Sequence, residues 1–141
     1  MQRLPLIALL LASCAAPRGP WVVQGTVDSA TASQALAIVE AAKRVAGPSA
    51  LDGGGRVVLL PSLEGFAPCT ARPGNHLSGC CACGGTQSTV YVLWPHPRCP
   101  AGADLTCSAL AHELGHVISL DEGRSDAFGL LVVQEWRRDL P

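Results

Sequence analysis

The sequence predicts a small α+β domain in which a short mixed sheet packs against helices. Three observations support this prediction. Short runs rich in β-branched residues alternate with longer segments of helical character. A cysteine-rich stretch without periodicity interrupts the pattern and is typical of a disulfide-stapled loop. The length, 141 residues, suits one domain.

The first predicted strand covers residues 21–27 (WVVQGTV), where β-branched residues dominate and a glycine indicates a bulge. Asp28 or Ser29 can cap a helix over residues 30–46, which Gly47 and Pro48 end. This backing helix is expected to place three apolar side chains near one face, those of Leu36, Val39 and Val45.

Residues 56–60 (RVVLL) predict a short apolar strand at the centre of the sheet, and residues 89–94 (TVYVLW) predict another strand. Residues 61–88 between them have no periodicity, so we expect a long stapled loop.

Two helices are predicted in the last third of the chain. Asp104 or Thr106 can cap the first of them, whose inward positions would be Leu105, Leu110, Leu114 and Val117. The second is expected to start near 123–125 and to end near Arg138. Four of its side chains are available for the core: Phe128, Leu131, Val132 and Trp136.

The N-terminus has the pattern of an export signal. One positive charge precedes an apolar run over residues 4–11, which is too short to span a bilayer as a mature helix. The following LASC resembles the lipobox of bacterial lipoproteins, which implies a signal peptide over 1–13 and a lipidated Cys14. Residues 14–20 would form a tether and 21–141 the domain. The alternative is an ordinary signal peptide with an incidental Cys14.

This N-terminus predicts a protein of the bacterial cell envelope that is exported and bound to the membrane through its lipid anchor. The net charge is −1 and only 15% of the residues are charged, so nothing indicates a nucleic-acid partner. The expected oligomeric state is a monomer.

Six cysteines besides Cys14 can form up to three disulfides, with fifteen possible connectivities. They are Cys69, Cys80, Cys81, Cys83, Cys99 and Cys107. The alternative for the 80–83 cluster is a second metal site with His76, since its spacing resembles that of metal ligands.

The pentapeptide HELGH at 112–116 carries the most specific chemistry. Residues four apart lie on the same face of a helix, about 6 Å apart along its axis, so His112 and His116 can bind one metal ion. Glu113 lies beside that face, where it can take a proton from a water molecule at the metal. This arrangement predicts a catalytic zinc site.

A catalytic zinc site needs a third protein ligand, and the next acids are Asp121, Glu122 and Asp126. Glu122 lies eight residues beyond the midpoint of the histidines, about 12 Å along a straight helix. A glutamate cannot bridge that distance, so the helix must end near 119–120 and the chain must fold back.

The segment HELGHVISLDE resembles the matrixin-type metzincin signature HExxHxxGxxH. The resemblance implies a zincin fold and places Glu122 at the position of the third ligand, where the family has histidine. The family's glycine is Ser119 here, and serine adopts a positive φ less readily than glycine. Met1 is the only methionine, so the family's methionine turn has no counterpart.

Residues 122–129 also resemble the ExxSDxFG segment of thermolysin-like gluzincins. This resemblance implies Glu122 as a zinc ligand and Asp126 as the residue that orients a ligand histidine. The aspzincin pattern leaves Asp126 open as an alternative ligand, and Asp121 is a further one.

The predicted function is a Zn²⁺-dependent metallopeptidase that acts on a protein or peptide substrate with Glu113 as general base. The residue that stabilises the oxyanion stays open among Tyr91, His96, His76 and Arg124. The alternative function is a non-catalytic, disulfide-stapled lipoprotein that acts as a binding module on the envelope.

Overall fold

The computed structural model of the chain describes residues 19–47, 49–63, 78–83 and 87–141. Within these residues, four strands form one mixed sheet in the order β1-β2-β4-β3. The strands β1 (Trp21–Gln24), β2 (Gly55–Leu60) and β4 (Ser88–Leu93) are parallel, whereas β3 (Gly79–Ala82) runs antiparallel to β4 at the edge. The small α+β fold predicted from the sequence is therefore confirmed.

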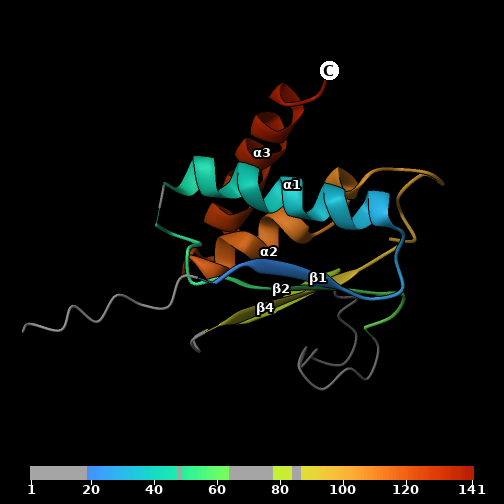
Figure 1. The fold of residues 1–141 in the computed structure, drawn as a ribbon, viewed down its shortest axis with the longest axis horizontal. Coiled ribbons are helices and arrows are strands. Elements are labelled where there is room, and N and C mark those ends of the chain that lie inside the picture. The colour runs from blue at the N-terminus through green and yellow to red at the C-terminus, as the bar shows by residue number, and fades with distance from the viewer. Residues whose placement is uncertain (1–18, 48, 64–77, 84–86) are drawn as a thin grey trace, which may run out of the picture.

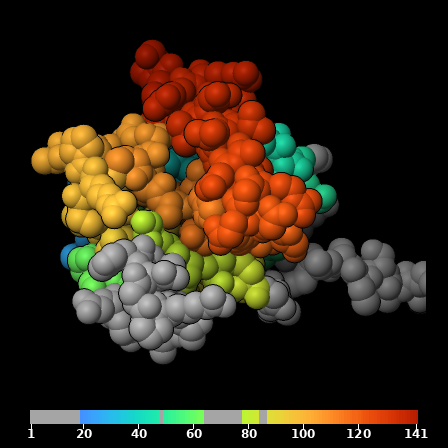
Figure 2. All heavy atoms as spheres, turned by 180° about the vertical axis from the view of Figure 1, so that it is seen from behind, coloured from blue at the N-terminus to red at the C-terminus, as the bar shows by residue number. Residues whose placement is uncertain are grey.

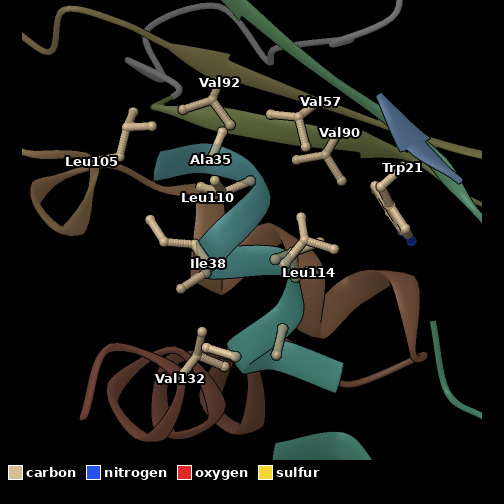
Figure 3. Close-up of a cluster of buried hydrophobic side chains, with 14 of the residues drawn as sticks. Trp21, Ala35, Ile38, Val57, Val90, Val92, Leu105, Leu110, Leu114 and Val132 are labelled. Atoms are coloured by element: carbon tan, nitrogen blue, oxygen red, sulfur yellow. The ribbon is translucent and has the colours of Figure 1, made fainter. Parts of the chain in front are cut away.

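The helices α1 (Ser29–Ala46), α2 (Leu110–Val117) and α3 (Glu122–Arg138) lie on one side of this sheet (Figure 1). A short 3₁₀ helix, η1 (Leu105–Cys107), precedes α2. Along β2 and β4 the buried residues alternate with less buried ones, as expected for strands with one covered face. The side chains of Val57, Val90 and Val92 extend from the sheet toward the helices (Figure 3).

Asp28 caps α1, since its side chain accepts a hydrogen bond of 2.7 Å from the Thr31 amide. The core face of α1 differs from the predicted one. Leu36 is 38% exposed, and the buried positions are mainly alanines together with Ile38 and Val39. Small side chains let the helix lie close to its neighbours, so alanines form a larger part of the buried face than the sequence pattern suggested.

The helix α3 begins at Glu122, one residue before the predicted range of 123–125, with Asp121 as its N-cap. One of its predicted core residues was wrong. Leu131 is 52% exposed, while Phe128, Val132 and Trp136 are buried as expected. The buried residues of α3 are spaced three or four apart along one face of the helix, and Leu131 lies outside this face.

Residues 61–88 are not entirely a loop, because β3 lies within this range. The GCCA sequence of β3 has neither β-branched residues nor alternation, and its strand conformation comes from pairing with β4. The predicted first strand is shorter than expected. Gly25, at a φ of 130°, follows its last residue, and a Cβ there would lie 2.4 Å from the Leu59 carbonyl oxygen.

Disulfides join Cys81 to Cys83 and Cys99 to Cys107, and Cys80 is also disulfide-bonded. Such bonds are typical of an oxidising, extracellular-type environment. The predicted signal peptide with Cys14, and the residues Cys69 and His76, lie outside the described ranges. Within the described ranges, no helix is long and apolar enough to cross a membrane.

The start of the HELGH helix differs from the prediction. Asp104 caps η1, accepting a bond of 3.1 Å from the Thr106 amide, and α2 begins five residues further on, at Leu110, without a side-chain cap. Leu105, Leu110 and Leu114 are buried as expected, and Val117 packs against the core while partly exposed.

The exit from α2 is a Schellman motif. The amide of Ser119 donates to the His116 carbonyl at 2.9 Å, and the amide of Leu120 donates to the Gly115 carbonyl at 3.1 Å. Ser119 has a φ of 66°, the left-handed conformation that glycine favours. The chain therefore turns back within four residues of the end of α2 although serine replaces the expected glycine.

The two helices after this turn pack closely because small residues face each other. A Cβ on Gly115 of α2 would lie 2.7 Å from the Ser125 hydroxyl and 3.0 Å from the Ser125 Cα of α3. A Cβ on Gly129 would lie 3.3 Å from the backbone nitrogen of His112. This packing places the first turn of α3 beside the histidine face of α2.

Replacing Ser119 with glycine should stabilise the protein by about 0.5–1 kcal/mol. The change removes the cost of a side chain in the left-handed region, which exceeds the entropy that glycine adds to the unfolded chain. Urea unfolding of the metal-free protein measures this difference. The matched control is Ser33→Gly, an exposed serine inside α1, which should lower stability. A Ser119→Gly protein less stable than the wild type would contradict the prediction.

Replacing Gly115 with alanine should lower the free energy of unfolding by about 1–3 kcal/mol, because the new methyl group forces α3 away from α2. The control is Gly123→Ala in the first turn of α3, where the nearest atom to a new Cβ lies 3.9 Å away. Chemical denaturation of both variants is the measurement. Equal stabilities for the two variants would show that a methyl group at position 115 does not force α2 and α3 apart.

Candidate metal centre

His112 and His116 lie four residues apart on α2, and their imidazole rings converge. Their Nε2 atoms are 3.0 Å apart, and the ring centroids are 4.8 Å apart with the planes nearly perpendicular. Both side chains are partly buried. The helical spacing read from HELGH therefore brings two nitrogen ligands to one point.

Glu122, the first residue of α3, reaches the same point from the other side. Its Oε2 lies 3.2 Å from His112 Nε2, and its Oε1 lies 3.3 Å from His116 Nε2. The side chain is 83% exposed, so one side of the cluster faces solvent. The turn at Ser119 is what makes this contact possible, because it reverses the chain before Glu122.

The second nitrogen of each ring has a fixed partner. His112 Nδ1 lies 2.7 Å from Asp126 Oδ1, and His116 Nδ1 lies 2.9 Å from the Leu120 carbonyl oxygen. Carboxylates and carbonyls only accept hydrogen bonds, so both Nδ1 atoms carry the proton. In the neutral rings, both Nε2 atoms therefore present lone pairs to each other and to the carboxylate of Glu122.

This convergence of lone pairs is unfavourable without a positive charge between them. Four-coordinate zinc, bound at about 2.0–2.1 Å, places neighbouring ligand atoms about 3.3–3.4 Å apart. The three separations here, 3.0, 3.2 and 3.3 Å, are within a few tenths of an ångström of that spacing. His112, Glu113 and His116 also keep one potential ligand atom each within 4.8 Å of the others. The cluster can hold a metal ion.

Glu113 is the buried acid of the cluster, with 6% of its surface exposed. Burial raises the pKa of Glu113 above its ordinary value, and the charge of Glu122 acts in the same direction. His116 and His112 lower this pKa, but by less than burial raises it. The Cα of Gly79 on β3 lies so close that a Cβ there would be 2.9 Å from Glu113 Cγ.

Asp121 and Asp126, the alternative third ligands, are engaged elsewhere. Asp121 accepts the Arg124 amide at 2.9 Å and the Arg124 Nε at 3.0 Å. These hydrogen bonds lower the pKa of Asp121. Asp126 bonds the Nδ1 side of His112, on the opposite side of the ring from the Nε2 atom. This is the orienting position that the gluzincin resemblance implied.

A cleft of about 410 Å³ opens beside these residues. It lies between α2 and α3 on one side and the edge strand β3 on the other, and Figure 2 shows this face, with the residues of β3 in yellow-green beside the helices in orange. Its lining consists of Ser78, Gly79, His96, Cys107, Ser108, Ala109, His112, Glu113, Glu122 and Asp126. Three acids and one histidine of the cluster, His112, thus line one cleft.

Several residues of the site were not recognised in the sequence. Ser125 is fully buried, and its hydroxyl lies 3.3 Å from His116 Nδ1. Gly115 and Gly129 permit the close packing of the helices, and Ser78 and Gly79 border the cleft. In the sequence, Gly115 lies between the two histidines of HELGH, and Ser125 lies between Glu122 and Asp126. Small residues at these two positions were a signal that the two helices pack closely there. Ser78 gave no signal, because only pairing of β3 with β4 places it there.

The comparisons found no match for this chain among protein-family models, curated proteins or solved structures. The chemistry of the cluster and its cleft is therefore the basis for assigning a function.

Proposed function

We propose that the protein is a zinc-dependent metallopeptidase. The observation that supports this most directly is the convergence of two imidazole lone pairs and one carboxylate beside a buried carboxyl group, at a cleft lined by His112, Glu113 and Glu122. A metal site with a purely structural role does not need a buried, unligated acid beside it. The resemblance to zincin signatures at HELGH and at residues 122–129 points to the same chemistry.

His112, His116 and Glu122 would hold the zinc ion. Asp126 and the Leu120 carbonyl would fix the two rings so that their Nε2 atoms face the ion. When bound, zinc polarises a peptide carbonyl and lowers the pKa of a coordinated water toward about 7.

Glu113 would act as the general base. Its burial raises its pKa, which brings the proton affinity of the carboxylate closer to that needed at neutral pH. The carboxylate takes a proton from the attacking water and later delivers it to the nitrogen of the leaving amine.

The edge strand β3 supports a peptide as the substrate. The Ser78 carbonyl accepts a hydrogen bond of 2.8 Å from the Leu93 amide, so Ser78 and Leu93 form a hydrogen-bonded pair. Because such pairs alternate in antiparallel strands, the backbone groups of Gly79 and Cys81 point away from β4. An extended peptide can add to this edge beside Glu113, as in β-augmentation.

We also propose that the enzyme acts in the bacterial cell envelope, anchored as a monomer through lipid on Cys14. The lipobox-like LASC and the disulfides of the described part support this location.

Replacing Glu113 with glutamine should abolish peptide hydrolysis while zinc stays bound. The amide keeps the size of the side chain but cannot accept the proton of the attacking water. The measurements are the zinc content of the purified protein and its cleavage of a reduced, alkylated protein substrate. Turnover by Glu113→Gln at the wild-type rate would exclude this mechanism. Zinc-loaded wild type without cleavage would favour the alternative, a non-catalytic binding module.

Replacing Glu122 with alanine should weaken zinc binding by at least about 100-fold, because the site loses its only anionic ligand. Competition with a zinc chelator of known affinity measures this change. The control is Glu40→Ala, an exposed glutamate on α1 that pairs with Lys43 and lies outside the cluster. An unchanged zinc affinity in Glu122→Ala would mean that another residue completes the site.

A further inference from the structure

Ser78 and His96 form a second polar cluster on the cleft, separate from the metal centre. Ser78 precedes β3, and His96 follows the end of β4. The Ser78 hydroxyl lies 2.8 Å from His96 Nε2, and both residues line the cleft together with Glu113 and Glu122. The Ser78 carbonyl is held by the Leu93 amide, so the residue has a fixed place at the edge of the sheet.

The direction of the Ser78–His96 bond follows from a third partner. The Arg98 amide donates to His96 Nδ1 at 3.1 Å, so that nitrogen carries no proton. A neutral His96 must then carry its proton on Nε2 and donate it to the Ser78 hydroxyl oxygen. The single hydroxyl proton of Ser78 remains for another acceptor.

This proton assignment decides between two roles for the pair. A serine nucleophile needs a histidine that accepts its proton, and His96 Nε2 is already protonated. The pair is instead arranged as a relay of donors that ends in the hydroxyl proton of Ser78. Such a donor suits a carbonyl or oxyanion acceptor in the cleft.

The position of Ser78 indicates which acceptor this would be. Ser78 is adjacent to Gly79, whose Cα packs against the side chain of Glu113. A peptide that adds to β3 therefore passes Ser78 next to the proposed general base. The substrate acceptor closest to Glu113 would be the carbonyl oxygen of the scissile peptide bond, on which negative charge develops during the reaction.

We propose that Ser78 is a catalytic residue that donates a hydrogen bond to the carbonyl oxygen of the scissile peptide bond, and that His96 is its positioning residue. This inference rests on the proposed peptidase function. Ser78 forms no covalent bond to the substrate and transfers no proton in this role. It supplies a preorganised donor on the strand side of the cleft, opposite the metal ligands of α2 and α3.

The test compares Ser78→Ala, Ser78→Thr and His96→Ala in the zinc-loaded full chain. The expected loss in Ser78→Ala is about 10- to 100-fold in kcat/KM on a pool of fluorogenic peptides, mainly through kcat, because the charge on the oxygen is largest in the transition state. Ser78→Thr keeps the hydroxyl and should recover most of the activity. His96→Ala should show a smaller loss of the same kind.

The control is Ser33→Ala. Ser33 is an exposed serine on α1 and does not line the cleft. This variant should keep kcat/KM within about threefold of the wild type.

A second readout does not depend on turnover. Calorimetry measures the affinity of a peptide phosphinate, which mimics the tetrahedral oxyanion, and of acetohydroxamate, a small metal-binding probe. Ser78→Ala should weaken the phosphinate about 10-fold or more and leave the hydroxamate unchanged. That pattern would support the inference even if the wild type cleaved none of the peptides, an outcome that would count against the proposed function alone.

Three outcomes would overturn the inference. The first is wild-type kcat/KM and phosphinate affinity in Ser78→Ala. The second is loss of zinc from Ser78→Ala, which would give the residue a structural role. The third is a wild type that binds no phosphinate, which would also remove the support for the peptidase.

Discussion

The close approach of α2 and α3 is the constraint on which the candidate site depends. Each helix carries two functional side chains four residues apart, His112 and His116 on α2 and Glu122 and Asp126 on α3. Because Gly115 leaves room for Ser125, the two pairs face each other, and each acid reaches an imidazole nitrogen. With a straight helix through residue 122, Glu122 would lie about 12 Å further along the axis. The site therefore requires the packing of α2 against α3 and cannot form on one helix alone.

The electrostatics of the two helix ends agree with this arrangement. His116 lies in the last turn of α2, where the helix dipole favours positive charge, and Glu122 lies in the first turn of α3, where the dipole favours negative charge. A cation between the two helices would be stabilised by the C-terminal end of α2 and by the carboxylate of Glu122. The same cation would also stabilise the charged form of Glu113, because the burial of this side chain raises its pKa.

The sequence predicted the parts of the site that local geometry decides. HELGH implies a shared helix face, and the reach of a glutamate implies that the helix ends before Glu122; the structure has both features. It did not predict β3, because GCCA has no strand pattern and depends on β4. Leu36 and Leu131 were assigned to the core by hydrophobicity, although alanines and glycines face the close contacts. Ser119 adopts the left-handed conformation because the hydrogen bonds of the Schellman motif offset its strain.

The opposite wall of the cleft is built differently from the metal side. Ser78 directly precedes β3, and His96 lies three residues beyond the end of β4. The disulfide between Cys99 and Cys107 joins the segment after His96 to the residues just before α2. Such a cross-link typically contributes about 2–4 kcal/mol to stability. Cys107 itself lines the cleft and is the last residue of η1, so the bond links the segment after His96 to the residues that lead into α2. The covalent link therefore restrains the separation of these two segments at the cleft.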